Sequence, residues 1–203
     1  MASLILPDEI DFSKYLRESE PKQRVKPAKE YVADLIEQLG KPIIFQGHPL
    51  PWLKTRSVFR FRPGEVTLWA GVNGHGKSLM TGFVMLDLIA ARHRVCIASF
   101  EMKPHSTAER MVRQWCGFPA YAEFAAHPDG IGATRDLYEQ FSGLTDGFLW
   151  FYDQQGTVTA DQVISVARYC AVELSVTHVF IDSLMKCVSG EDDYNGQKKF
   201  VDE

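Results

Sequence analysis

One eight-residue stretch of the chain carries residue types that bind phosphate. It matches the pattern G-x-x-x-x-G-K-[ST] without a break and reads Gly71-Val72-Asn73-Gly74-His75-Gly76-Lys77-Ser78. Glycines let the backbone turn tightly, so that successive N–H groups approach phosphate oxygens, and a following helix presents its positive N-terminal end to the same anion. The lysine of such a loop reaches the β- and γ-phosphates, and the hydroxyl binds Mg²⁺. The motif therefore predicts binding of a nucleoside triphosphate.

The loop residues have different expected roles. We expect the nucleotide to contact Gly71, Asn73, Gly74, His75, Gly76, Lys77 and Ser78. Lys77 also has a catalytic role, because its charge can stabilise the phosphate oxygens during transfer, and Ser78 is a metal ligand. His75 occupies a free position of the pattern, so we interpret it as a solvated loop residue rather than a base. The alternative is a glycine-rich turn that matches the pattern by chance.

The flanking residues predict the context that a phosphate loop needs. Residues 65 to 70 are rich in β-branched and aromatic types and follow the turn pair Pro63-Gly64, which predicts a buried strand. A helix is expected from Ser78 to Ala91, where apolar residues recur at helical spacing. These residues are Leu79, Phe83, Leu86 and Ala90.

Two carboxylates complete the candidate site. Val179 to Asp182 is a short apolar run that ends in an acid, as in a Walker B strand, where Asp182 would hold Mg²⁺ through water or pair with the Ser78 hydroxyl. Glu101 directly follows another expected strand and would lie at the same sheet edge, where it could orient and deprotonate a water. Its alternative role is that of a helix-entry acid, because Pro104 begins a helix three residues later.

The remaining pattern predicts an α/β fold with a parallel sheet. Strands are expected at 94–100, 148–153 and 177–182, and helices at 104–116 and 160–174. Between them, residues 117 to 147 contain several glycines and prolines, which predict loops around one short helix near 134–141. The apolar side of the 104–116 helix would carry Met111, Val112 and Trp115.

The N-terminal residues are expected to form an arm outside the compact core. The first 25 residues are polar, residues 22 to 27 resemble a linker, and a helix is expected from Ala28 to Leu39. Residues 41 to 53 are rich in proline and predict an extended segment that lies on the core, with Trp52 as its apolar anchor. We therefore divide the chain into an arm with a linker helix, 1–50, and an ATPase core, 51–203.

The order of the three motifs resembles a known family. The loop, the segment Ser99-Phe100-Glu101-Met102 and the Walker B run are similar to the RecA-like P-loop NTPase core of hexameric replicative DNA helicases of the DnaB class. The likeness is strongest to phage primase-helicases and the related mitochondrial helicase Twinkle, and it is carried also by residues 62–78 and 192–200. It covers roughly residues 50 to 203. In that family the acid of the S-[LF]-E-M segment is the catalytic base, which here is Glu101.

The resemblance implies a function. The chain would be an ATP hydrolase that uses Mg²⁺. It would work in a homo-oligomeric ring that translocates on single-stranded DNA during replication, with a primase as a further partner in some members of the family. The linker that packs on an adjacent protomer would correspond to residues 22 to 56. Two other classes stay open: another RecA-like ATPase such as a recombinase or KaiC-like switch, and a nucleotide-binding module that joins or inhibits a ring.

The same family has further parts that this sequence does not show. Missing are the next strand with its phosphate sensor, the later DNA-binding loops, the arginine finger, and a primase zinc-binding or Toprim region. We therefore expect a core that is incomplete at its C-terminus, with weak nucleotide binding and little helicase activity alone. We also expect residues 66–70 and 177–182 to lack the strand that would lie between them.

Composition fits this interpretation. The 203 residues are 45% hydrophobic, enough for one sizeable domain, and contain no stretch that could span a bilayer, so we expect a soluble protein of the bacterial or phage-infected cytoplasm, without a membrane partner. The four cysteines are scattered and indicate neither disulfides nor a zinc site.

The charged residues are unevenly distributed along the chain. Residues 1–63 hold 11 Lys and Arg against 8 Asp and Glu, whereas the remainder holds 11 Lys and Arg against 18 Asp and Glu. A basic strip in the first part, Lys54, Arg56, Arg60 and Arg62, could face a nucleic-acid backbone, but a solvated edge is the favoured interpretation.

Overall fold

The chain folds as an α/β structure in which helices flank a parallel sheet. The computed structural model describes residues 3–5, 11–15, 27–39 and 47–187. The strands are β1 (Ser3–Ile5), β2 (His48–Pro49), β3 (Arg60–Phe61), β4 (Val95–Ser99), β5 (Leu149–Tyr152) and β6 (His178–Asp182). The α-helices are α2 (Ala28–Gln38), α3 (Lys77–Ala90), α4 (Pro104–Cys116), α5 (Phe118–Ala126), α6 (Gly130–Thr145) and α7 (Ala160–Glu173). Short 3₁₀ helices are η2 (Phe12–Tyr15) and η3 (Leu184–Cys187).

The main sheet has four strands in the order β1-β5-β4-β6, and all three neighbouring pairs are parallel. Val95 is opposite His178 and Ser99 is opposite Asp182, so β4 and β6 begin and end together. Because parallel strands end at the same edge, the residues that follow β4 and β6 lie close together. This register places the segments after Ser99 and Asp182 side by side.

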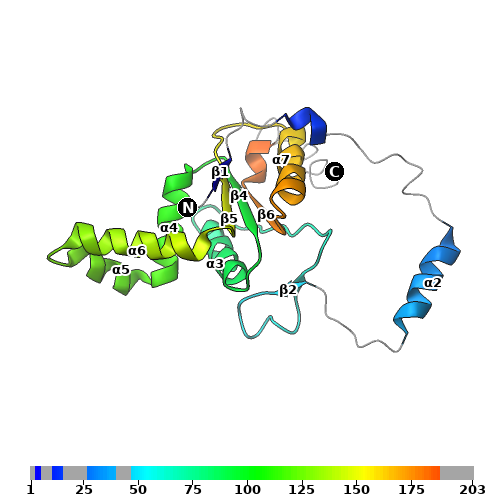
Figure 1. Ribbon diagram of the computed structural model, residues 1–203, viewed down its shortest axis with the longest axis horizontal. Coiled ribbons are helices and arrows are strands. Elements are labelled where there is room, and N and C mark those ends of the chain that lie inside the picture. The colour runs from blue at the N-terminus through cyan, green and yellow to red at the C-terminus, as the bar shows by residue number, and fades with distance from the viewer. Residues whose placement is uncertain (1–2, 6–10, 16–26, 40–46, 188–203) are drawn as a thin grey trace.

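The sheet separates two hydrophobic clusters. Alternate residues of β4 point to opposite faces, with Val95 and Ile97 on one side and Cys96 and Ala98 on the other. The first side packs against α3, α4 and α6, through Leu88, Met111, Phe141 and their neighbours. The second side is covered by α7 (Figure 1), so the core strands are buried on both faces.

Most of the predicted core elements are confirmed. The expected strands at 94–100, 148–153 and 177–182 are β4, β5 and β6, and the expected helices at 28–39, 78–91, 104–116 and 160–174 are α2, α3, α4 and α7. Met111 and Val112 are buried as predicted, whereas Trp115 is 36% exposed. The face of α3 that packs on the sheet carries Val84, Met85, Leu88 and Ile89, while Leu79 and Phe83 are about half exposed.

The prediction for residues 117 to 147 was wrong in its loops: the helix expected near 134–141 is confirmed but extends over 130–145 as α6, and α5 replaces an expected loop. Pro119 lies in the first turn of α5, where a missing backbone N–H is tolerated. At the start of α6, the Asp129 carboxylate accepts a hydrogen bond from the Gly132 N–H at 3.2 Å and caps the helix. Burial of Leu137 and Phe141, four residues apart, then outweighs the weak helix propensity of the glycines.

The predicted buried strand at residues 65–70 was also wrong. This segment has no regular secondary structure, and Val66 and Leu68 are 74% and 62% exposed. Trp69 alone packs on the core, where its ring centroid is 6.4 Å from that of Trp52. Among the described residues no strand pairs with the outer edge of β6. A strand without a partner leaves its backbone groups unpaired, so the pattern alone does not produce one.

Parts of the N-terminal arm lie on the core. Ser3–Ile5 pairs with β5 as β1, and η2 packs against α7, where Arg168 donates to the Tyr15 carbonyl at 2.8 Å. The Tyr15 hydroxyl also donates to the Glu173 carboxylate at 2.8 Å. The expected linker at 22–27 falls almost entirely outside the described residues. The first residues thus contribute an edge strand that the polar composition did not suggest.

Of the segment predicted to be extended, residues 48–49 form strand β2, whereas residues 51–58 form bends and turns, with the Thr55 N–H donating to the Trp52 carbonyl at 2.9 Å; residues 41–46 lie outside the described part. β2 pairs with β3, Leu50 is buried in the first cluster, and Trp52 packs on the same cluster. The basic strip is solvated. Arg56 lies 3.9 Å from Asp87 and Arg62 lies 3.0 Å from Glu65, and Arg60 donates to the Gly47 carbonyl. These contacts agree with the favoured interpretation of a solvated edge.

Three histidines form a row at the end of the sheet where β4 and β6 begin. The ring centroids of His48 and His93 are 4.9 Å apart, and those of His93 and His178 are 5.1 Å apart. His48 is also hydrogen-bonded to Asp87 at 2.8 Å. Burial, with a smaller contribution from His93 and His48, lowers the pKa of His178 to about 4. Burial and the neighbouring imidazoles lower the pKa of both His93 and His178, which favours the neutral form of these two residues in the folded chain.

The row predicts a loss of stability on mild acidification. An unfolded histidine has a pKa of about 6.5, so between pH 6.5 and 4 the unfolded chain binds a proton at His178 that the folded chain does not. Stability present above pH 6.5 is then lost as the pH falls, by about 1–2 kcal/mol after allowance for solvent screening. Urea unfolding at pH 7.5 and pH 5 measures this loss. His178→Gln should flatten the pH dependence and His105→Gln, at an exposed position, should not; equal pH dependence in both variants would contradict the prediction.

In the part of the chain that the structure describes, no helix is both long and apolar enough to cross a membrane. Cys96, Cys116, Cys170 and Cys187 are free thiols.

Candidate functional site

The phosphate loop leads directly into α3. Gly74 and Gly76 have φ of 83° and 81°, a left-handed conformation that other residues rarely adopt, and Gly76 is the residue that precedes the first turn of the helix. The loop is closed by a hydrogen bond from the His75 N–H to the Val72 carbonyl at 3.2 Å. The N-terminal end of a 14-residue helix therefore opens onto the loop, which favours an anion there.

Lys77 folds back over this loop. Its ammonium donates to the Gly71 carbonyl at 2.7 Å, to the Val72 carbonyl at 3.3 Å and to Asn73 Oδ1 at 3.2 Å. All three acceptors belong to the loop itself, so the positive charge is held at its centre. Such a compact, mobile ammonium is suited to binding phosphate oxygens.

Ser78 and Asp182 are brought together from positions 104 residues apart. The Ser78 hydroxyl donates to Asp182 Oδ2 at 3.1 Å, and both residues are half-buried. This contact is the one that the sequence predicted between the loop and the strand that ends in an acid. A hydroxyl and a carboxylate oxygen are hard ligands of the kind that Mg²⁺ prefers.

Few protein ligands are needed for such a metal. No group of three His, Cys, Asp or Glu side chains within the described ranges is arranged to hold an ion. Magnesium at a phosphate site binds one or two protein oxygens and takes the others from water and phosphate. Ser78 and Asp182 are therefore sufficient as candidate ligands.

Glu101 lies at the same edge of the sheet. It follows β4 by two residues, is exposed, and its Oε1 accepts a hydrogen bond from the Ser183 hydroxyl at 2.7 Å. Ser183 is the neighbour of Asp182, so the acid after β4 and the acid at the end of β6 are joined through one residue. The structure thus brings together Lys77 and Ser78 in one group and Glu101 and Asp182 in another, linked by the Ser78–Asp182 hydrogen bond. Of the remaining loop residues, Asn73 contacts Lys77, and His75 is exposed.

Sequence reasoning missed Ser183 and Gln155. Gln155 follows β5 and donates to the Met102 carbonyl at 3.1 Å and to the Ser99 carbonyl at 3.4 Å, which ties β5 to the turn that carries Glu101. Ser183 was adjacent to a residue already singled out, and its hydroxyl was the available signal. Gln155 gave no signal, because its role depends on the order of strands in the sheet.

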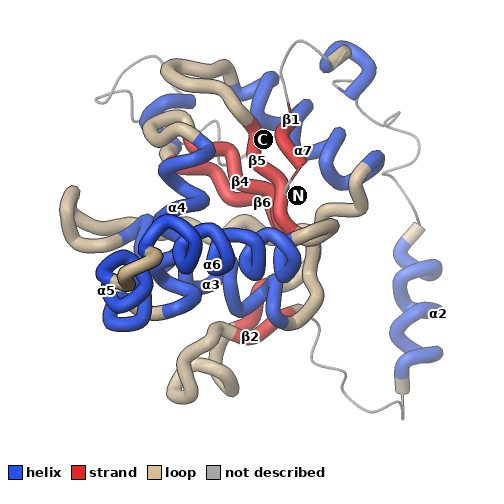
Figure 2. Tube along the Cα trace, turned by 60° about the vertical axis from the view of Figure 1, so that its left-hand side comes forward, coloured by secondary structure: helices blue, strands red, loops and turns tan. Residues whose placement is uncertain are grey.

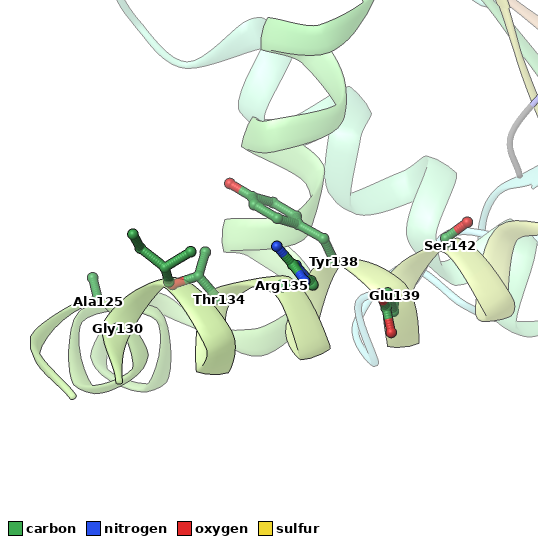
Figure 3. Close-up of a pocket in the computed structure, with 8 residues that line it drawn as sticks. Ala125, Gly130, Thr134, Arg135, Tyr138, Glu139 and Ser142 are labelled. Atoms are coloured by element: carbon green, nitrogen blue, oxygen red, sulfur yellow. The ribbon is translucent and has the colours of Figure 1, made fainter. Parts of the chain in front are cut away.

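A hollow of about 830 Å³ lies elsewhere, along α5 and α6. Figure 3 shows Thr134, Arg135 and Tyr138 on α6 beside it. None of the candidate site residues lines this hollow, and its surface is mainly apolar. It therefore has no connection with the phosphate chemistry described above.

No protein-family model matches the chain, and a comparison with curated proteins finds no relative. The interpretation of the site rests on its residues and geometry.

Proposed function

We propose that this chain is the ATP-binding and ATP-hydrolysing core of a ring-forming replicative DNA helicase, with a RecA-like P-loop fold. The hydrogen bond between Ser78 and Asp182 is the observation that carries the proposal. It joins a phosphate loop to an acidic strand end, as a magnesium-dependent triphosphate site requires. Glu101 at the same sheet edge supplies the third function, that of a base.

Each residue has a role in this proposal. The loop N–H groups and the N-terminus of α3 bind the phosphates, and Lys77 exchanges its loop carbonyl acceptors for phosphate oxygens. Ser78 and Asp182 hold Mg²⁺, which neutralises charge on the phosphates. Glu101 orients a water toward the γ-phosphate and accepts its proton.

The proposal also includes a homo-oligomeric ring on single-stranded DNA. Val32, Leu35, Ile36 and Leu39, along α2, are each more than half exposed. Figures 1 and 2 show α2 apart from the sheet and its flanking helices. A neighbouring copy that covers these side chains would remove apolar surface from water.

Magnesium dependence tests the nucleotide site. We expect the purified chain to bind ATP more tightly with Mg²⁺ than with EDTA, as measured by calorimetry. Asp182→Asn should lose most of this difference, because the amide is a weaker ligand than the carboxylate; a loss of about tenfold in affinity corresponds to 1.4 kcal/mol. Asp136→Asn, at an exposed position on α6, is the control. Equal Mg²⁺ dependence in both variants would exclude Asp182 as a ligand.

DNA dependence tests the motor. Hydrolysis of ATP should increase when single-stranded DNA is added, and this increase should fall steeply with salt, because phosphate contacts release counterions. An ATPase that responds instead to duplex pairing or to a protein partner would indicate another RecA-like ATPase. Loss of unwinding when the chain is mixed with an intact ring helicase would indicate an inhibitory module.

A further inference from the structure

We infer that Ser183 is a positioning residue that holds the Glu101 carboxylate in the orientation needed to activate water; this inference rests on the proposed hydrolytic function. Its hydroxyl donates to Glu101 Oε1 at 2.7 Å. An O–H donor and a carboxylate at this distance form a short, charge-assisted hydrogen bond.

The backbone on both sides of this contact is already fixed. The Phe100 N–H donates to the Asp182 carbonyl at 2.7 Å, and the Gly156 N–H donates to the Phe100 carbonyl at 3.1 Å. The Met102 N–H donates to Ser99 Oγ at 3.2 Å. The turn that carries Glu101 is therefore held against the end of β6 and the segment after β5 by main-chain contacts.

The Glu101 side chain has no such support from burial. It is exposed and has three rotatable bonds, so without a partner it would populate several rotamers. The Ser183 hydroxyl selects one of them. It uses Oε1 only, which leaves Oε2 for a water molecule. A hydroxyl on the residue after Asp182 thus fixes the base relative to the metal ligand.

The backbone of Ser183 is held in position by a hydrogen bond that does not depend on its hydroxyl. Its carbonyl accepts from the Lys186 N–H at 3.1 Å, a bond of η3 that does not involve the side chain. We therefore expect Ser183→Ala to fold like the wild-type chain. This makes the hydroxyl separable from the structure around it.

Single-turnover hydrolysis of radiolabelled MgATP by the purified chain tests the inference. We expect Ser183→Ala to lower the rate about 10- to 100-fold, since misplacement of a catalytic group by about 1 Å can cost 10²-fold, while the Kd for MgATP changes less than about twofold. Ser183→Thr, which keeps the hydroxyl, should restore most of the rate. Ser106→Ala, at another half-buried serine, is the control.

The double variant separates positioning from a general structural effect. In a Glu101→Gln background, Ser183→Ala should lower the rate no further, because the base it positions is already gone. A wild-type rate in Ser183→Ala, or equal losses with and without Glu101, would overturn the inference and leave the proposed function standing. A wild-type chain that binds MgATP but never hydrolyses it would overturn both.

Discussion

Replacing Lys77 with alanine is expected to weaken MgATP binding about 100-fold or more. Lys77 holds the charge at the centre of the loop, 2.7 Å from the Gly71 carbonyl. In the complex, phosphate oxygens would replace these neutral acceptors, and hydrogen bonds to charged groups contribute about 1.5–3 kcal/mol each. The loss of about 3 kcal/mol corresponds to a factor of more than 100 in Kd. Calorimetry with MgATP measures it.

The control for Lys77 is Lys54→Ala. It removes the same charge from an exposed position in the segment before the loop, so it reports any long-range electrostatic effect. Because the hydrogen-bond acceptors of the Lys77 ammonium within the described part of the chain all belong to the loop, the melting temperature of Lys77→Ala should remain within a few degrees of wild type. A Kd within about twofold of wild type would show that the loop does not bind phosphate.

Local patterns predicted the core of the fold, because the features they depend on are local. The apolar runs at β4, β5 and β6 appear in the sequence itself. α5 was missed, and α6 was predicted too short, because glycine and proline were counted as breakers without regard to position. In the first turn of a helix these residues cost little.

The strands that were predicted wrongly or missed are those whose formation depends on a partner strand far away in the sequence. Residues 65–70 have the composition of a strand, but a strand also needs a neighbour, and composition does not show whether one exists. The same limit applies to Ser3–Ile5, which forms a strand only because the edge of β5 is there to receive it. For Ser3–Ile5 the partner strand lies 147 residues further along the chain, whereas for residues 65–70 no partner is present in the described part of the chain.

The residues of the candidate site, too, were predicted where the signal is local in the sequence and missed where it is not. The loop was found because its motif is complete in the sequence, and Asp182 and Glu101 were found because each stands at the end of a strand that could be placed from the sequence. The closeness of Glu101 and Asp182 then follows from two parallel strands, β4 and β6, that end together, whereas the Ser78–Asp182 contact was expected from the two motifs themselves. The Ser183–Glu101 contact depends on a side-chain rotamer, which no periodicity encodes.

Replacing Glu101 with glutamine is expected to lower ATP hydrolysis about 10²- to 10⁴-fold, the range for loss of a general base. The amide has nearly the same shape, so its oxygen can still accept from the Ser183 hydroxyl, but it cannot take a proton from water. Glu101 contacts none of the loop residues through a hydrogen bond described here, so the Kd for MgATP should stay within about twofold of wild type. Single-turnover rates and calorimetry measure the two quantities separately.

The pair of variants then distinguishes binding from chemistry. Lys77→Ala should lose affinity, whereas Glu101→Gln should keep affinity and lose turnover, so that nucleotide remains bound and unhydrolysed. Glu139→Gln, at an exposed position on α6, is the matched control. If Glu101→Gln hydrolyses ATP at the wild-type rate, Glu101 is only the helix-entry acid that its position before α4 also allows, and the base must be sought on another element.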